Sequence, residues 1–285
     1  MKFNVLFFCF GLATCVAFSQ KSSVFSNPDK NYQTALELFS KQQYASAQKE
    51  FDKLVDFENP VYNDVSTDAE YYSAICALEL FNPDAEYRIG RFIIRHPESP
   101  RVKMAHFQMG RYQYRNKNFD DALYWLEKVK KYDLSTDELA EYYFKMAHSY
   151  FSVGNTEKAN KIFYELTDKE NKYSSPALYY YSHIEYINKN YETALNGFEK
   201  LKKDATFSVV VPYYLAHIYY QQKKYDKLIA YVPNLLDSVS GKRAPELTRI
   251  VGESYYRTGN YLPALKYLTR SEEHTSELQS PNTKS

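Results

Sequence analysis

The small, apolar and polar positions of this chain recur together, at intervals of 34 to 38 residues. The block is clearest over residues 140–172, where the pattern predicts a helix, a turn at Gly154-Asn155 and a second helix. Ala147 and Ala159 lie where the two helices would cross, and Phe163 lies one turn further along the same face. Because so short a hairpin cannot bury its own apolar face, we expect a stack of similar hairpins.

The register of the block follows from the small residue of each second helix, which we call the anchor. The anchors are Ala47, Ala85, Ala122, Ala159, Ala194, Leu228 and Ala264. Twelve residues earlier the chain always carries a small residue, as close approach of two helices requires: Ala35, Ser73, Gly110, Ala147, Ser182, Ala216 and Gly252. Four residues after each anchor the residue is large and apolar: Phe51, Ile89, Leu126, Phe163, Phe198, Val232 and Leu268. This agreement predicts seven helix pairs.

This spacing of small, aromatic and apolar residues resembles the tetratricopeptide repeat (TPR), over about residues 28–269. The resemblance implies an all-α fold, a right-handed α-solenoid of about seven TPR-like hairpins, which we place at residues 31–269. The family's early Trp is absent, since Trp125 lies in a second helix, and Leu228 replaces an anchor Ala. Pro233 is expected to end the second helix that contains Leu228.

Residues 1–19 have the pattern of a signal peptide: a positively charged start, an apolar stretch and a small-x-small site at Ala17-Phe18-Ser19. We therefore expect export, with a polar lead over residues 20–30. Lipid attachment at Cys15 is an alternative, because the residues before it loosely resemble a bacterial lipobox. Membrane association is expected only through such a lipid or through a C-terminal part that is missing here.

The repeat pattern stops at Thr269, and residues 270–280 read Arg-Ser-Glu-Glu-His-Thr-Ser-Glu-Leu-Gln-Ser. This stretch resembles, codon for codon, the translation of a common sequencing-library adapter. We expect residues 270–285 to be a non-native tail and the natural gene to continue. The seventh unit would then be truncated within its second helix.

Composition and charge exclude several functions. The net charge is +1 with both signs interspersed, which argues against nucleic acid and a polybasic membrane surface as partners. We find no Gly-rich phosphate loop, no His-Glu-x-x-His and no nucleophile elbow, so we expect neither an enzyme nor a cofactor or metal. Once the leader is removed, Cys76 is the sole cysteine, and we interpret it as a small buried hydrophobe.

One stretch suggests a cellular setting. The segment from Arg95 to Pro100, followed by a helix with Gly110, is similar to the repeats of bacterial outer-membrane assembly lipoproteins and of the Tol–Pal accessory protein. The aromatic-rich composition and the Ser19-Gln20 junction also resemble exported envelope TPR proteins of the Bacteroidota. These resemblances imply a docking scaffold in the periplasm or at the outer-membrane periphery of a Gram-negative bacterium.

In the repeat family the first helices line a concave groove, with contacts fifteen, eleven and eight residues before the anchor. The candidate partner-binding residues at these positions are Phe107, Arg111, Phe144, His148, Phe151, Tyr179, His183, Tyr186, Tyr213, His217 and Tyr220. The three histidines either hydrogen-bond neighbouring groups and order the layer, or contact a ligand, or bind a metal; the spacing of neighbouring helices disfavours a metal. The tyrosines are likewise either packing or a binding platform.

The function we expect is a non-enzymatic scaffold that docks an extended peptide or a helix of a protein partner in this groove. Binding of glycan or peptidoglycan is an alternative, since exposed tyrosines stack on sugar rings. Another is the sensor half of a longer signalling protein whose C-terminal part is missing.

Overall fold

A computed structural model describes residues 28–55, 63–168, 170–232, 236 and 243–279 of the chain, and over these residues it is helical with no β-strand. The predicted signal peptide with Cys15, the polar lead up to residue 27, Pro233 and residues 280–285 lie outside the described residues. The all-α fold class is confirmed.

The helices alternate between the first and the second member of a hairpin. The first helices are α1 (Pro28–Ser40), α3 (Asp64–Leu80), α5 (Arg101–Arg115), α7 (Thr136–Ser152), α9 (Ser174–Ile187), α11 (Val211–Gln221) and α13 (Arg243–Arg257). The second helices are α2 (Tyr44–Asp52), α4 (Ala85–Arg95), α6 (Phe119–Leu126), α8 (Thr156–Thr167), α10 (Tyr191–Leu201), α12 (Tyr225–Tyr231) and α14 (Tyr261–Gln279). A short 3₁₀ turn, Lys131–Asp133, precedes α7. Helix α14 runs across the predicted tail boundary after Thr269.

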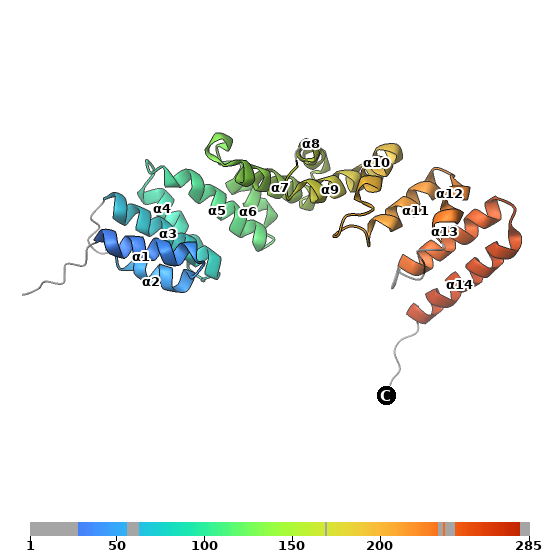
Figure 1. Cartoon of the computed structure of the whole chain (residues 1–285), viewed down its shortest axis with the longest axis horizontal. Coiled ribbons are helices and arrows are strands. Elements are labelled where there is room, and N and C mark those ends of the chain that lie inside the picture. Colours follow the sequence, from blue (N-terminus) through green and yellow to red (C-terminus); the bar gives the residue numbers. More distant parts are fainter. Residues whose placement is uncertain (1–27, 56–62, 169, 233–235, 237–242, 280–285) are drawn as a thin grey trace, which may run out of the picture. The chain divides into compact units, whose positions relative to one another are not determined.

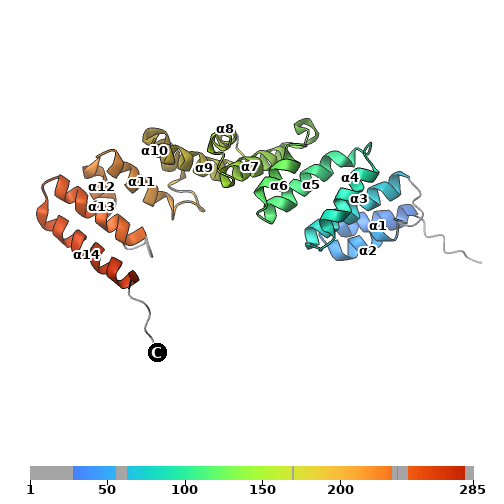
Figure 2. The ribbon, with the colours of Figure 1, turned by 180° about the vertical axis from the view of Figure 1, so that it is seen from behind.

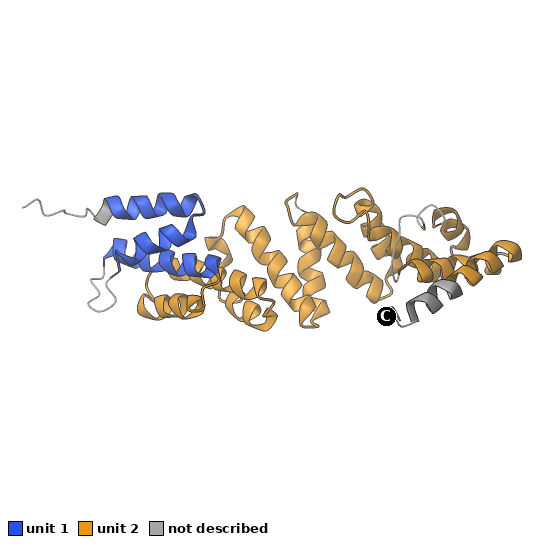
Figure 3. Ribbon diagram, turned by 90° about the horizontal axis from the view of Figure 1, so that it is seen from below, with its two compact units in different colours: residues 1–80 blue, residues 81–285 orange. Residues whose placement is uncertain are grey.

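The chain forms two compact units, one ending at Leu80 and one beginning at Phe81 (Figure 3). In the first unit α2 packs against both α1 and α3. In the second unit, helices that follow one another in sequence are neighbours in space, as both views show (Figures 1 and 2). None of the described helices is long and apolar enough to cross a membrane.

The predicted register is confirmed by burial. All seven anchors are at most 1% exposed, and the small residues twelve positions earlier are all buried. The large apolar residue four positions after the anchor is fully buried in six hairpins, and Leu268 in α14 is half-buried. At Gly110 an added Cβ would lie 2.7 Å from the Leu126 side chain. The absence of a Cβ at Gly110 therefore allows α5 and α6 to approach this closely.

Six of the seven hairpin turns share one backbone conformation. In each of these six the residue five positions before the anchor has a positive φ: Gln42, Lys117, Gly154, Lys189, Lys223 and Gly259. Around Gly154, the Asn155 N–H donates to Tyr150 O at 2.8 Å and the Gly154 N–H donates to Phe151 O at 3.1 Å. This pair of bonds is the Schellman motif, which ends a helix and reverses the chain.

The second hairpin differs at its turn. Its positive φ falls at Phe81, four residues before the anchor Ala85, and α4 begins only at Ala85 itself. In the third hairpin, by contrast, α6 begins at Phe119, three residues before its anchor. The turn of the second hairpin contains Pro83, which has no N–H to donate to a helix.

Cys76 is fully buried in α3, in the core of the first unit. Burial is the main cause that raises the pKa of its thiol to about 12, and the neighbouring Asp52 and Glu79 add to the effect. A thiol in this setting stays protonated at neutral pH, so its interpretation as a buried hydrophobe is confirmed.

Candidate interaction face on the first helices

We use the name first-helix layer for the side chains that α5, α7, α9, α11 and α13 carry on the predicted groove positions. All eleven predicted residues lie on these helices, within the second unit. None of them is exposed: nine are half-buried, while Phe107 is 1% and His217 is 6% exposed.

Phe107 belongs to the packed interior and cannot contact a partner. Its ring lies 6.5 Å from the Tyr142 ring, and it joins the core cluster of α6, α7 and α8. His217 is covered in the same way, because the Tyr213 ring packs on it at 4.5 Å. Solvent therefore reaches fewer of the candidate residues than the sequence predicts, because Phe107 and His217 are covered.

His148 shows how a histidine of this layer orders its surroundings. Its Nε2 lies 3.0 Å from the Tyr180 hydroxyl, so one hydrogen bond joins α7 to α9. The Tyr114 and Tyr180 rings meet the imidazole edge-to-face at 5.5 and 5.0 Å. His148 therefore acts as the first of the three interpretations proposes: it hydrogen-bonds a neighbouring group and orders the layer.

His183 and His217 occupy equivalent places on the next two helices. The His183 ring stacks parallel to Tyr179 at 6.1 Å and meets Tyr214 of α11 at 5.3 Å, while its buried Nδ1 has no hydrogen-bond partner. His217 Nε2 lies 3.4 Å from Glu246 Oε1 of α13, without the geometry of a hydrogen bond. Among the described residues, no group of three potential metal ligands comes together.

Burial lowers the pKa of all three imidazoles. It is the largest cause in each case, and Lys145 adds to it at His148. At His217, Glu246 opposes the effect and raises the pKa, without overcoming burial. The row is therefore neutral at neutral pH, and its members act as aromatic and hydrogen-bonding groups rather than as cations.

The tyrosines of the layer pack against neighbouring aromatic rings and are only partly accessible to solvent. Tyr179 stacks on Phe207 at 4.7 Å and meets Tyr214, which stacks on Phe198 at 4.8 Å. Burial raises the pKa of the Tyr179 hydroxyl, and the Tyr214 hydroxyl 3.5 Å away adds to the effect. These rings hold α9, α10 and α11 together, so truncating them would open a cavity.

Tyr213 and Tyr220 tie α11 to α13. Tyr213 donates to Glu246 Oε2 at 2.6 Å, and Tyr220 donates to Glu253. Burial is the first cause that raises the pKa of Tyr213, and Glu246 is the second. Both hydroxyls are therefore engaged within the chain, while half-buried ring surface remains.

At the other end of the layer, the candidate Arg111 meets two charged residues that were not among the candidates, Glu141 and Lys145. Arg111 Nε donates to Glu141 Oε1 of α7 at 2.8 Å, and Lys145 Nζ lies 3.6 Å from the same oxygen. The Arg111–Glu141 pair occupies the same register positions as His217 and Glu246: the residue eleven positions before one anchor lies beside the residue eighteen positions before the following anchor. Comparing consecutive units, rather than one position across all units, would have revealed it.

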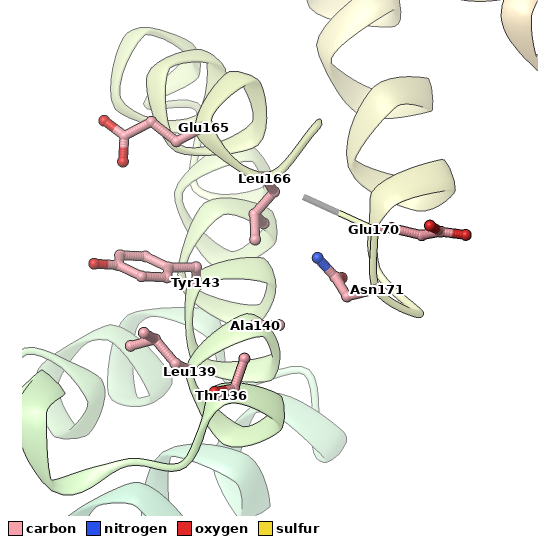
Figure 4. A pocket seen from close by; sticks show the side chains of 8 residues that line it. All are labelled: Thr136, Leu139, Ala140, Tyr143, Glu165, Leu166, Glu170 and Asn171. Atoms are coloured by element: carbon pink, nitrogen blue, oxygen red, sulfur yellow. The ribbon is translucent and has the colours of Figure 1, made fainter. Parts of the chain in front are cut away.

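A separate pocket of about 170 Å³ lies at the end of the fourth hairpin, where α7 begins and α8 ends (Figure 4). Its walls are mainly apolar, and it is lined by Thr136, Leu139, Ala140, Tyr143, Glu165, Leu166, Glu170 and Asn171. In Figure 4 the Glu165 and Glu170 carboxylates point away from one another, so the polar groups do not converge on a ligand position.

Comparison with solved structures supports the fold. A crystal structure of MamA is 17% identical, covers 65% of this chain and all of its own, and has a TM-score of 0.52. The apo form of RapI is 14% identical, covers 89% of this chain and 78% of its own, and has a TM-score of 0.54. No protein-family model matches the chain, and no curated protein sequence does. The likeness shows a TPR-like helical-repeat fold, as predicted.

Proposed function

We propose that this chain is a non-enzymatic interaction scaffold whose first-helix layer docks an extended or helical segment of a protein partner. One observation carries the proposal: successive first helices from α5 to α13 are tied side chain to side chain across the layer. The ties include Arg111 to Glu141, His148 to Tyr180 and Tyr213 to Glu246. A surface that is already ordered loses little conformational entropy when a partner binds.

The half-buried rings favour a protein partner over a glycan. A sugar ring stacks on the open face of an aromatic side chain, but Phe207 covers a face of Tyr179 and Phe198 covers a face of Tyr214. A peptide uses ring edges and hydroxyls as well as faces, and it contacts several helices in turn. The half-buried residues Phe151, Tyr186 and Tyr220 suit that mode.

Photo-crosslinking tests the proposal without removing packed rings. A benzophenone amino acid is placed at Tyr186 or Tyr220, and as matched controls at Tyr87 of α4 or Tyr124 of α6, which are exposed tyrosines of second helices. We expect the same partner adduct from both first-helix positions and none from the controls, with cooperative thermal unfolding in all four proteins. Equal adducts from the second-helix positions would place docking elsewhere and reject the proposal.

The proposed setting is the bacterial envelope, at the periplasm or outer-membrane periphery. It is supported by the signal-peptide pattern of residues 1–19 and by the envelope-protein resemblance of the repeats. Mass spectrometry of the mature protein expressed in a Gram-negative host tests it. A chain starting at Gln20 is expected; a lipid-modified chain starting at Cys15 would support the membrane-anchored alternative, and an uncleaved chain would contradict export.

A further inference from the structure

Two cations on the first helices α5 and α7 converge on one carboxylate. Arg111 Nε donates to Glu141 Oε1 at 2.8 Å, and Lys145 Nζ lies 3.6 Å from the same oxygen. Both positive groups therefore lie close together, one on α5 and one on α7. The side chain of Lys145 is only 13% exposed.

The single negative charge of Glu141 does not balance its neighbours. Burial lowers the pKa of the Lys145 ammonium; Glu141 raises it, while Arg111 and Arg115 lower it further by repulsion. Arg111 Nη1 also donates a hydrogen bond to Oε1 of the neutral Gln108 side chain, at 3.0 Å. Arg111 and Lys145 thus share one carboxylate, and the ammonium has a long ion pair and the face of the Tyr114 ring to compensate for its lost hydration.

Tyrosine hydroxyls also lie around this point. The Lys145 ammonium lies 4.1 Å from the centre of the Tyr114 ring, and the Tyr114 hydroxyl is near those of Tyr173 and Tyr180, whose proximity adds to the rise of its pKa to about 12. Burial is the main cause of that rise. Phenol and guanidinium donors around a desolvated ammonium are the surroundings in which proteins bind carboxylates.

The other end of the same layer is balanced. On α13, Arg249 pairs with Glu253, and Glu246 accepts a hydrogen bond from Tyr213, whose ring centre lies 5.2 Å from the Arg243 guanidinium carbon, so two arginines match two carboxylates. The excess of positive charge is therefore local to α5 and α7, in a chain whose net charge is only +1.

We propose that the partner segment docked on this layer is acidic, and that Asp or Glu side chains of that segment bind between Arg111 and Lys145. The inference rests on the proposed scaffold function and specifies its partner. An incoming carboxylate supplies the charge that Glu141 alone cannot, and it accepts hydrogen bonds from donors of α5 and α7 together.

A labelled peptide tests the charge requirement directly. The probe is fluorescein-Glu-Glu-Phe-Glu-Glu with an amidated C-terminus, and the reference probes carry Gln or Lys in place of every Glu. Binding to the full chain is followed by fluorescence anisotropy at two salt concentrations. We expect the acidic probe to bind at least roughly tenfold more tightly than either reference, with binding weakened by added salt.

Variants locate the binding. The pair Arg111→Gln and Lys145→Gln is expected to weaken binding of the acidic probe by roughly tenfold or more, since each charge removed lies at the point of contact. The matched control, Lys161→Gln with Lys200→Gln, removes two exposed lysines of the second helices α8 and α10 and should change little. Glu141→Gln should strengthen binding, because it removes the competing carboxylate. Circular dichroism checks that each variant is folded.

The outcomes separate this inference from the scaffold proposal. Equal binding of the acidic and Gln probes, or equal losses in the two double variants, would overturn the acidic-segment inference. So would binding of the acidic probe only when its C-terminal amide is replaced by a free carboxylate. If crosslinks still form from Tyr186 and Tyr220 in that case, the scaffold proposal stands with a partner of different chemistry. If those crosslinks are absent as well, both proposals fail.

Discussion

The residues at the hairpin turns carry a conformational cost that the sequence shows only in part. Gly154 and Gly259 are recognisable as turn residues, because glycine adopts positive φ readily. Lys117, Lys189 and Lys223 adopt the same conformation and carry no such signal. Their side chains lie in solvent, so nothing in their chemistry marks the turn, and only the constant offset from the anchor locates them.

The cost of positive φ is measurable at Gly154. An added Cβ there meets no atom within 4 Å, so Gly154→Ala tests the backbone conformation alone. We expect a loss of about 1–2 kcal/mol in the free energy of unfolding by urea. Gly90, inside α4, also has open space around it and no positive φ, so Gly90→Ala should stabilise by about 0.5–1 kcal/mol. The same sign for both variants would contradict the assigned turn geometry.

The lowered pKa of His183 predicts a dependence of stability on pH. The unfolded chain takes up a proton on this imidazole as pH falls through about 6.5, while the folded chain resists it, so stability declines from about pH 7 downward. His183→Phe keeps an aromatic ring beside Tyr179 and Tyr214 and should reduce the loss of unfolding free energy between pH 7.5 and 5.5. His183→Gln cannot titrate either and should share this flatter profile. An unchanged slope in both variants would refute the role of this group.

At the scale of helices, the sequence predicted the crossings better than the contacts between hairpins. The small residues and anchors could be found in the sequence because each recurs at one register position. Close approach of two helices at that position depends on the volume of the side chain there. The eleven candidate residues lie on first helices, as their register positions predict. Ties such as Arg111 to Glu141 pair different positions of consecutive units, and the burial of Phe107 depends on the particular neighbours it meets. A pattern that compares one register position across all units shows neither the Arg111–Glu141 tie nor the burial of Phe107.

The α9–α10 crossing gives a test at this scale. A Cβ at Gly197 would lie 1.9 Å from Ser182 Oγ, which is held by its bond to Leu178 O at 2.7 Å. Gly197→Ala is therefore expected to destabilise by about 1–3 kcal/mol through overpacking. The double variant with Ser182→Gly removes the clash, so the two changes should be strongly non-additive in a double-mutant cycle. Additive effects would show that the helices separate freely.

At the scale of the whole chain, the repeats divide into two compact units. The division into compact units falls between Leu80 and Phe81, in the hairpin whose turn is shifted by one residue and whose second helix starts late. Each repeat in such a protein is stabilised mainly by its immediate neighbours, so an irregular hairpin limits how far cooperativity spreads.

Matched core truncations test whether the two units open separately. Phe51 in the first unit and Phe163 in the second occupy the same register position and are both fully buried. Each change to alanine is expected to cost about 3–5 kcal/mol. Hydrogen–deuterium exchange read by mass spectrometry should show Phe51→Ala speeding exchange in α1 to α3 and leaving α7 to α10 protected, with Phe163→Ala giving the reverse. Faster exchange across both units in either variant would mean that the chain unfolds as one cooperative body.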